Sequence, residues 1–114
     1  MSSSLNDKLM RIRDALAPTA TKVFHYWRTN AKPPYLIWME DGEDQSFSAD
    51  NRKHEQQIHG TADYFTKLEF DPAIDRIQDA LNAVTSGATG WTLTAVQYEE
   101  ETSLIHYTWN WWVV

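Results

Sequence analysis

The residues best suited to chemistry in this chain are four histidines, three of which fall in segments with the pattern of strands. Imidazole nitrogens that converge from neighbouring strands could hold a metal ion. Their spacing follows neither HxH nor HExxH, and a histidine on the polar side of a strand usually makes an ordinary hydrogen bond. We therefore expect no metal ion and no cofactor at these residues, which are His25, His54, His59 and His106.

A second candidate is the acidic run from Glu40 to Asp44, which is followed by Asp50 and Asn51. Carboxylate and amide oxygens at alternating positions are the ligands that a hard cation such as Ca²⁺ prefers. The run does not follow the calcium-binding loop motif, however, because it lacks the closing glutamate at the required offset. We interpret it as a polar surface that contacts other proteins.

No catalytic constellation is recognisable in the sequence. None of the four glycines lies in a phosphate-binding motif, and no serine sits in a strand-turn-helix elbow. Cysteine is absent, so the sequence excludes disulfides, thiolate metal ligands and thiol nucleophiles. The sequence predicts a protein that is not an enzyme.

Length and charge restrict the remaining possibilities. The 114 residues are enough for one domain, spanning 1–114, with a single core. A net charge of −6 with scattered Lys and Arg argues against binding to the nucleic-acid backbone. The N-terminal segment lacks the apolar core of a signal peptide, and no stretch approaches the roughly 20 apolar residues of a membrane span. We expect synthesis in the cytoplasm and no membrane partner.

Two strand-like segments position the acidic run. Tyr35–Met39 is aromatic and aliphatic, and it follows Pro33-Pro34, which prevents a helix from continuing across it. Gln57–Thr66 alternates in polarity with the two-residue period of a sheet that has one drier face. The polar segment Glu40–Glu55 is expected to be a long loop between them.

The remaining segments predict two amphipathic helices and three more strands. Ser4 and Asp7 predict a capping box at the start of the first helix, and Asp71-Pro72 predicts the start of the second, which Gly87 and Gly90 end. The first strand is expected to form an antiparallel hairpin with Tyr35–Met39. The expected ranges are helix Leu5–Ala17, strand Lys22–Arg28, the helix after Asp71, and a terminal hairpin of Trp91–Glu99 and Leu104–Val114.

The order of these elements predicts the fold class. Two one-sided helices need one apolar sheet face to cover, and the last strand provides such a face in Ile105, Tyr107, Trp109, Trp111 and Val113. We expect an α+β, two-layer sandwich in the order α-β-β-β-α-β-β. Its sheet would have about five mostly antiparallel strands with both helices on one face.

The long polar loop is expected to be an interaction surface. Loops longer than about 15 residues are uncommon inside compact domains and often functional. We expect residues 44–54 to become ordered on contact with a partner, with Phe47 as an apolar anchor. Asp50 and Asn51 would then hydrogen-bond the neighbouring backbone, although the same pair also suits a plain turn.

The chain contains six tryptophans, more than a small interior needs, so some are expected at an interface. Trp112 lies on the outer side of the last strand in the predicted alternation. The residues predicted to contact other proteins are Glu40, Asp41, Asp44, Phe47, Asp50, Asn51 and Trp112.

Several short motifs follow one another between residues 23 and 112. They are His25-x-Trp27, Pro33-Pro34-Tyr35 leading into Glu40-Asp41-Gly42, Phe47 before Ala49-Asp50-Asn51, the helix after Asp71-Pro72 and the closing hairpin. This succession resembles the small tail-completion or tail-terminator proteins of long-tailed bacteriophages and prophages. The PPY…EDG…F-x-ADN string is its most specific part, while the helices and hairpin agree only in pattern and length. The tryptophan-rich last strand departs from the family pattern.

The resemblance implies a structural protein of the virion tail, made in the host cytoplasm. Such proteins form a ring, commonly a hexamer, on the last ring of the tail tube. There they stop tube polymerisation and join the tail to the head. The implied partners are therefore copies of the chain itself, the tail-tube protein and a head-completion or connector protein.

Two other interpretations remain open. A small acidic protein-binding module or inhibitor would use the same loop and exposed tryptophans on a single partner. A small-molecule-binding α+β domain would instead use an aromatic pocket, for which Tyr26, Trp38 and Trp109 are the candidate residues.

Overall fold

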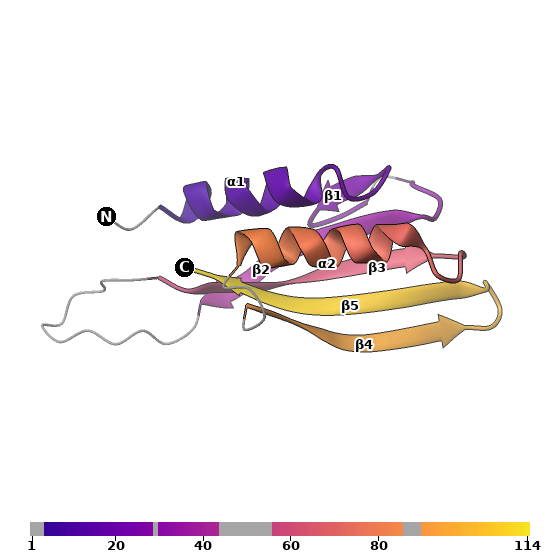
Figure 1. Ribbon diagram of the computed structural model, residues 1–114. Helices are drawn as coiled ribbons and strands as arrows, with labels where there is room; N and C mark the ends of the chain where they lie inside the picture. The colour runs from indigo at the N-terminus through magenta and orange to yellow at the C-terminus, as the bar shows by residue number, and fades with distance from the viewer. Residues whose placement is uncertain (1–3, 29, 44–55, 86–89) are drawn as a thin grey trace, which may run out of the picture.

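The computed structural model describes residues 4–28, 30–43, 56–85 and 90–114, and confirms the α+β fold in the expected order. Two helices lie side by side on one face of a five-stranded sheet (Figure 1). The elements are α1 (Leu5–Leu16), β1 (Val23–His25), β2 (Tyr35–Glu43), β3 (Ile58–Thr66), α2 (Pro72–Val84), β4 (Trp91–Glu99) and β5 (Leu104–Val113).

The strand order in the sheet is β1-β2-β3-β5-β4. Three of the four pairings are antiparallel, but β1 and β2 run parallel, with Val23 opposite Leu36. The expected antiparallel hairpin between these two strands is therefore wrong. The chain turns back between them, with Tyr26 and Asn30 at positive φ (76° and 43°), so β2 begins beside the start of β1.

Local sequence signals explain where the two helices begin. The side chain of Ser4 accepts a hydrogen bond from the Asp7 backbone while Asp7 accepts one from the Ser4 backbone, which confirms the capping box. Asp71 caps α2 and Pro72 occupies its first turn. α2 ends at Val84 with Thr85 as its C-cap, before the glycines that were expected to end it. Of these glycines, Gly87 lies outside the described residues.

The core lies between the helices and the sheet. The row Ile58, Gly60, Ala62, Tyr64 and Thr66 of β3 is buried while the alternate residues are half-buried, as the two-residue period predicted. Each large apolar side chain buried there stabilises the fold by roughly 1.5–3 kcal/mol. The core consists of Ile12, Leu16, Leu36, Trp38, Ile58, Ala62, Tyr64, Ala73, Ile77, Leu81, Trp109, Trp111 and Val113.

A close approach of two strands and an indole ring explains the glycine in the middle of the sheet. A Cβ atom at Gly60 would lie 2.2 Å from the Met39 carbonyl oxygen and 2.3 Å from Cζ2 of Trp111. Only a glycine lets Trp111 lie against the β3 backbone at this point.

Neither helix of the described residues lies on the other face of the sheet (Figure 1). Aromatic rings stack across it: Tyr35 on Phe65 with centroids 4.9 Å apart, and Phe65 on His106 at 4.1 Å. The guanidinium of Arg28 lies 5.0 Å from the Tyr35 ring centre, at the β1 end of this row. We call this side of the sheet the open face.

Candidate functional site

The first residues of the predicted loop are part of a strand. β2 continues through Glu43, so Glu40 and Asp41 belong to this strand and do not start a loop as expected; Glu40 pairs with Gly60 of β3. The register shifts between Glu40 and Gly42, which marks a bulge. Consecutive residues of a strand point to opposite faces, so Glu40 points to the helix side and Asp41 to the open face.

Glu40 is engaged by its own chain. Its carboxylate lies 2.8 Å from Nε2 of His25 and accepts a hydrogen bond from the Tyr26 hydroxyl. Burial opposes ionisation of Glu40, but the hydrogen bonds from Tyr26 and His25 outweigh it and hold the pKa of Glu40 below its usual value. The same hydrogen bond to Glu40 raises the pKa of Tyr26. His25 in turn stacks on Trp38, with ring centroids 3.8 Å apart. The carboxylate of Glu40 therefore contacts side chains of its own chain at the end of β1.

Asp41 and Trp112 do come together. Oδ1 of Asp41 forms a hydrogen bond with Nδ1 of His59. A shallow depression of about 350 Å³ on the open face is lined by Asp41, His59, Gly60, Asn110 and Trp112. Trp112 is half-buried there and pairs with His59 in the sheet register. Two of the predicted contact residues therefore share one surface.

The other predicted contact residues are not described by the structure. Asp44, Phe47, Asp50 and Asn51 lie outside the described residues, as does His54. The prediction that this segment orders on contact with a partner stays a prediction.

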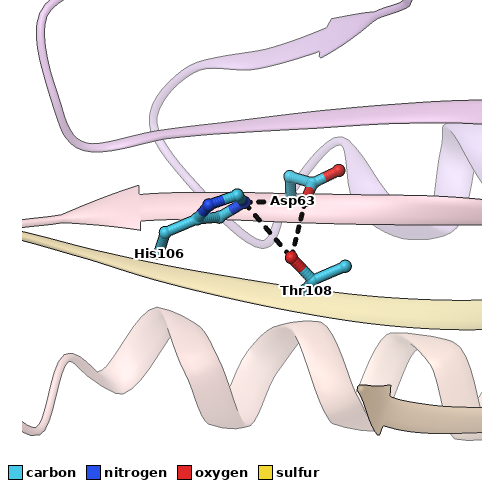
Figure 2. A network of polar contacts seen from close by, with 3 residues as sticks. All are labelled: Asp63, His106 and Thr108. Carbon is cyan, nitrogen blue, oxygen red and sulfur yellow. Dashed lines mark hydrogen bonds and ion pairs between the residues drawn. The ribbon is translucent and has the colours of Figure 1, made fainter. Parts of the chain in front are cut away.

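A three-residue polar network crosses the open face between β3 and β5 (Figure 2). Nε2 of His106 lies 2.7 Å from Oδ1 of Asp63 and 3.2 Å from Oγ1 of Thr108, which donates to Asp63 at 2.8 Å. In a nucleophilic triad the acid and the hydroxyl contact different ring nitrogens, so that the imidazole relays a proton. Here both contact the same nitrogen, and the network holds two strands together without forming such a relay.

The three described histidines share one arrangement. Each pairs with a carboxylate, and in each case the pair bridges neighbouring strands: β1 to β2, β2 to β3, and β3 to β5. Within residues 4–28, 30–43, 56–85 and 90–114, no three His, Cys, Asp or Glu side chains gather as a metal site requires. The pairs are His25–Glu40, His59–Asp41 and His106–Asp63.

The most exposed large apolar side chain among the described residues was not predicted from the sequence. Phe70 is 89% exposed, has a positive φ of 59°, and stands at the rim of a groove of about 790 Å³. A bulky residue in this backbone region is strained, and strain of this kind is often found at functional sites. The groove runs between the start of α2 and the β4–β5 hairpin, and its apolar walls are Phe70, Ile74, Tyr98, Ile105 and Tyr107.

The residues at the start of α2 explain why the Phe70 ring is exposed. Phe70 precedes the N-cap Asp71, where an apolar residue commonly packs on the fourth helical residue. That residue is Asp75, so the usual apolar contact cannot form and the ring remains outside.

The outer strand β4 is the second feature that the sequence did not reveal. On its helix side Leu93, Val96 and Tyr98 are 40%, 53% and 62% exposed, because α2 lies over β5 and reaches only the start of β4 (Figure 1). Residues 91–98 carry no charge, although edge strands usually carry charges that prevent pairing with other chains. We call Leu93, Val96 and Tyr98 the apolar row of β4.

The three residues proposed for a small-molecule pocket are not arranged as one. Trp38 and Trp109 are buried in the core, and Nε1 of Trp109 donates to Gln78 of α2 at 3.1 Å. Tyr26 is 42% exposed and hydrogen-bonded to Glu40 at the end of β1. The suggested grouping of these aromatic residues is wrong.

No family model matches this chain, and no curated protein is similar to it in sequence. Neither helix in the described part of the chain is long and apolar enough to cross a bilayer.

Proposed function

We propose that the chain is a self-assembling structural protein of a phage tail. In this proposal it forms a ring, commonly of six copies, on the end of the tail tube, stops polymerisation of the tube and joins the tail to the head. It acts by binding its own copies, the tail-tube protein and a head-completion protein, and performs no catalysis.

The observation that carries the proposal is the unprotected edge of the sheet. β4 presents unpaired backbone groups and an exposed apolar row, and such an edge is a site for association with another chain. The assignment to a phage tail is supported by the motif string from Pro33 to Asn51 that resembles tail terminators.

Termination also requires a subunit with two different sides, because growth halts only if the far side cannot bind another tube subunit. One side of this fold is formed by two helices. The other is the open face, with its stacked rings and the depression lined by Asp41 and Trp112. This difference between the two sides is consistent with one surface for the tube and another for the head.

Electron microscopy of the chain mixed with tail tubes tests the proposal. The tubes would be assembled from a purified tail-tube protein. The wild-type chain should cap tube ends and limit tube length, and Val96→Asp should abolish capping. The matched control is Gln97→Asp. It introduces the same negative charge at the next residue of β4, which faces the opposite side of the sheet. Tubes that grow equally long with and without the wild-type chain would contradict the proposal.

A protein-binding module that uses the groove on one foreign partner is the second candidate. The strained, exposed Phe70 beside that groove is the observation that favours it. A chain that remains monomeric at high concentration and leaves tube length unchanged would favour this candidate over the ring.

A further inference from the structure

The charges of the chain are unevenly distributed along the sequence. Residues 4–34 contain six basic and two acidic residues, a formal charge of +4. Residues 67–103 contain seven acidic and two basic residues, a formal charge of −5. These two segments are distant in the chain, so the sequence alone does not show how their charges are arranged in space.

The strand order puts these segments at opposite edges of the molecule. β1 and β4 are the two outer strands of the sheet. α1 packs beside β1 and β2, where Leu9 and Arg13 line a depression with His25 and Trp38. α2 lies over β5 and touches the start of β4, since Trp91 Nε1 donates to Asn82 at 2.7 Å. The basic segment therefore lies along one edge and the acidic segment along the other (Figure 1), although Lys8 and Asp71 within them are buried.

The basic edge has three cations and exposed aromatic rings. Lys22, Arg28 and Lys32 flank β1, and no acidic residue occurs between Thr19 and Pro34. Lys22 and Arg28 donate to backbone carbonyls of the same segment, and neither takes part in a salt bridge among the described residues. Trp27 is 69% exposed beside them. This edge offers positive charge and an uncovered indole.

The acidic edge has the complementary character. Glu99, Glu100 and Glu101 are exposed at the turn between β4 and β5, and the groove beside them is lined by Glu69, Asp71 and Asp75 and by one cation, Lys67. The apolar row of β4 and the groove walls supply uncovered apolar surface next to these carboxylates. In the part of the chain that the structure describes, none of the three glutamates forms a salt bridge.

We propose that copies of this chain associate head to tail, with the basic β1 edge of one copy bound to the acidic β4 edge of the next. The three cations face the three glutamates, and Trp27 packs against the apolar row of β4. The inference rests on the ring proposed above and names the surfaces that would close it. An interface between two different patches can repeat around a ring, whereas a two-fold contact joins only two copies.

Charge decides which partner occupies the β4 edge. Two β4 edges face to face would bring like charges together, which opposes a two-fold dimer through this strand. The basic edge alone would also attract a nucleic acid. A nucleic acid on the basic edge would leave the apolar row of β4 and the acidic groove uncovered. A second copy of the chain would instead bring opposite charges together and cover the apolar row.

Charge reversal tests the proposal because the reversals can be made to compensate. The basic-edge variant is Arg28→Glu with Lys32→Glu, and the acidic-edge variant is Glu99→Lys with Glu101→Lys. These residues are exposed, so circular dichroism should show that both variants keep the fold. Sedimentation velocity of the wild type over a wide concentration range should show self-association. Each variant alone should weaken it about tenfold or more.

An equimolar mixture of the two variants should restore association, because each carries the edge that the other lacks. A chain with both reversals should associate like the wild type. Asp14→Lys makes the same acid-to-lysine change on the exposed side of α1 and is the matched control, which should not weaken association.

Three results would overturn the inference: a wild-type chain that stays monomeric at millimolar concentration, variants that associate as well as the wild type, or a mixture that fails to restore association. Fluorescence anisotropy with labelled duplex DNA tests a fourth such result. If the wild type and the acidic-edge variant bind DNA and the basic-edge variant does not, the basic edge would be assigned to nucleic acid. Rings that form as described but do not cap tail tubes would leave this inference standing and contradict the proposed function.

Discussion

At the scale of single residues, Asp71 organises the junction between β3 and α2. Its carboxylate accepts hydrogen bonds from the Tyr64 hydroxyl at 2.7 Å, the Thr66 hydroxyl at 2.8 Å and the Ala73 amide at 2.9 Å. Burial opposes its ionisation, but these hydrogen bonds outweigh burial and lower the pKa of Asp71. Burial, together with the neighbouring Asp71, raises the pKa of Tyr64. A helix cap and a core hydroxyl thus depend on one carboxylate.

Replacing Asp71 should separate its two roles. Asp71→Ala removes the cap and leaves the Tyr64 hydroxyl buried without its acceptor, so we expect a loss of about 2–3 kcal/mol in the free energy of unfolding. Asp71→Asn keeps one accepting oxygen and should cost about 1 kcal/mol. Urea denaturation at neutral pH measures both. Equal stability of the alanine variant and the wild type would contradict the assignment.

The lowered pKa of Asp71 also predicts a dependence of stability on pH. The folded state holds the carboxylate ionised to lower pH than the unfolded state, whose Asp pKa is about 3.9. The stabilisation is therefore complete above about pH 5 and is lost as the pH falls through the folded value. The difference in melting temperature between the wild type and Asp71→Asn should shrink when measured from pH 7 down to pH 3. A constant difference would show that ionisation of Asp71 contributes nothing.

Gly60 is a second residue on which the fold depends. A methyl group there would collide with the Met39 carbonyl oxygen, which cannot move without breaking the β2–β3 pairing. We expect Gly60→Ala to destabilise the protein by about 3 kcal/mol or more, seen as a lower urea midpoint. Thr61→Ala, the neighbouring position on the open face, should change stability by less than about 1 kcal/mol.

At the scale of elements, the segment that joins β3 to α2 carries strain without an evident structural benefit. Phe70 has a positive φ, exposes most of its ring and has no apolar residue at the matching position of α2. An aromatic side chain held in this way is better explained by a contact with another chain than by the stability of its own.

Phe70→Gly should therefore affect stability and association in opposite directions. Glycine adopts positive φ without strain, so the free energy of unfolding should stay the same or rise by about 1 kcal/mol. Removal of the exposed ring should weaken self-association, as sedimentation velocity would show. A variant that is clearly less stable than the wild type would mean that Phe70 supports the fold instead.

At the scale of the whole molecule, the strand order creates two edges of opposite charge. Interactions between exposed charges are screened over about 8 Å at physiological ionic strength, so head-to-tail association should depend on salt. Raising NaCl from about 0.05 M to about 0.5 M should weaken it by about tenfold. Association that strengthens with salt would indicate an interface held by apolar contacts alone.

Much of the fold could be predicted from the sequence because the signals are local. The capping box at Ser4, the Asp71-Pro72 helix start and the alternation from Ile58 to Thr66 each depend on residues close in the chain. The parallel pairing of β1 and β2 was missed because it depends on how the chain turns back between the two strands. The bulge at Asp41 was missed for a similar reason, since it depends on the register with β3.

The sequence by itself determined the class of the fold, the starts of its two helices, the order of its strands along the chain and the alternation of β3 and β5, because periodicity and caps act between neighbouring residues. Only the tertiary structure decided that β2 extends through Glu40 and Asp41 and that β4 keeps an uncovered apolar row. It alone also placed the basic and acidic segments at opposite edges. These outcomes depend on strand order and register, which bring together residues that are distant in the chain.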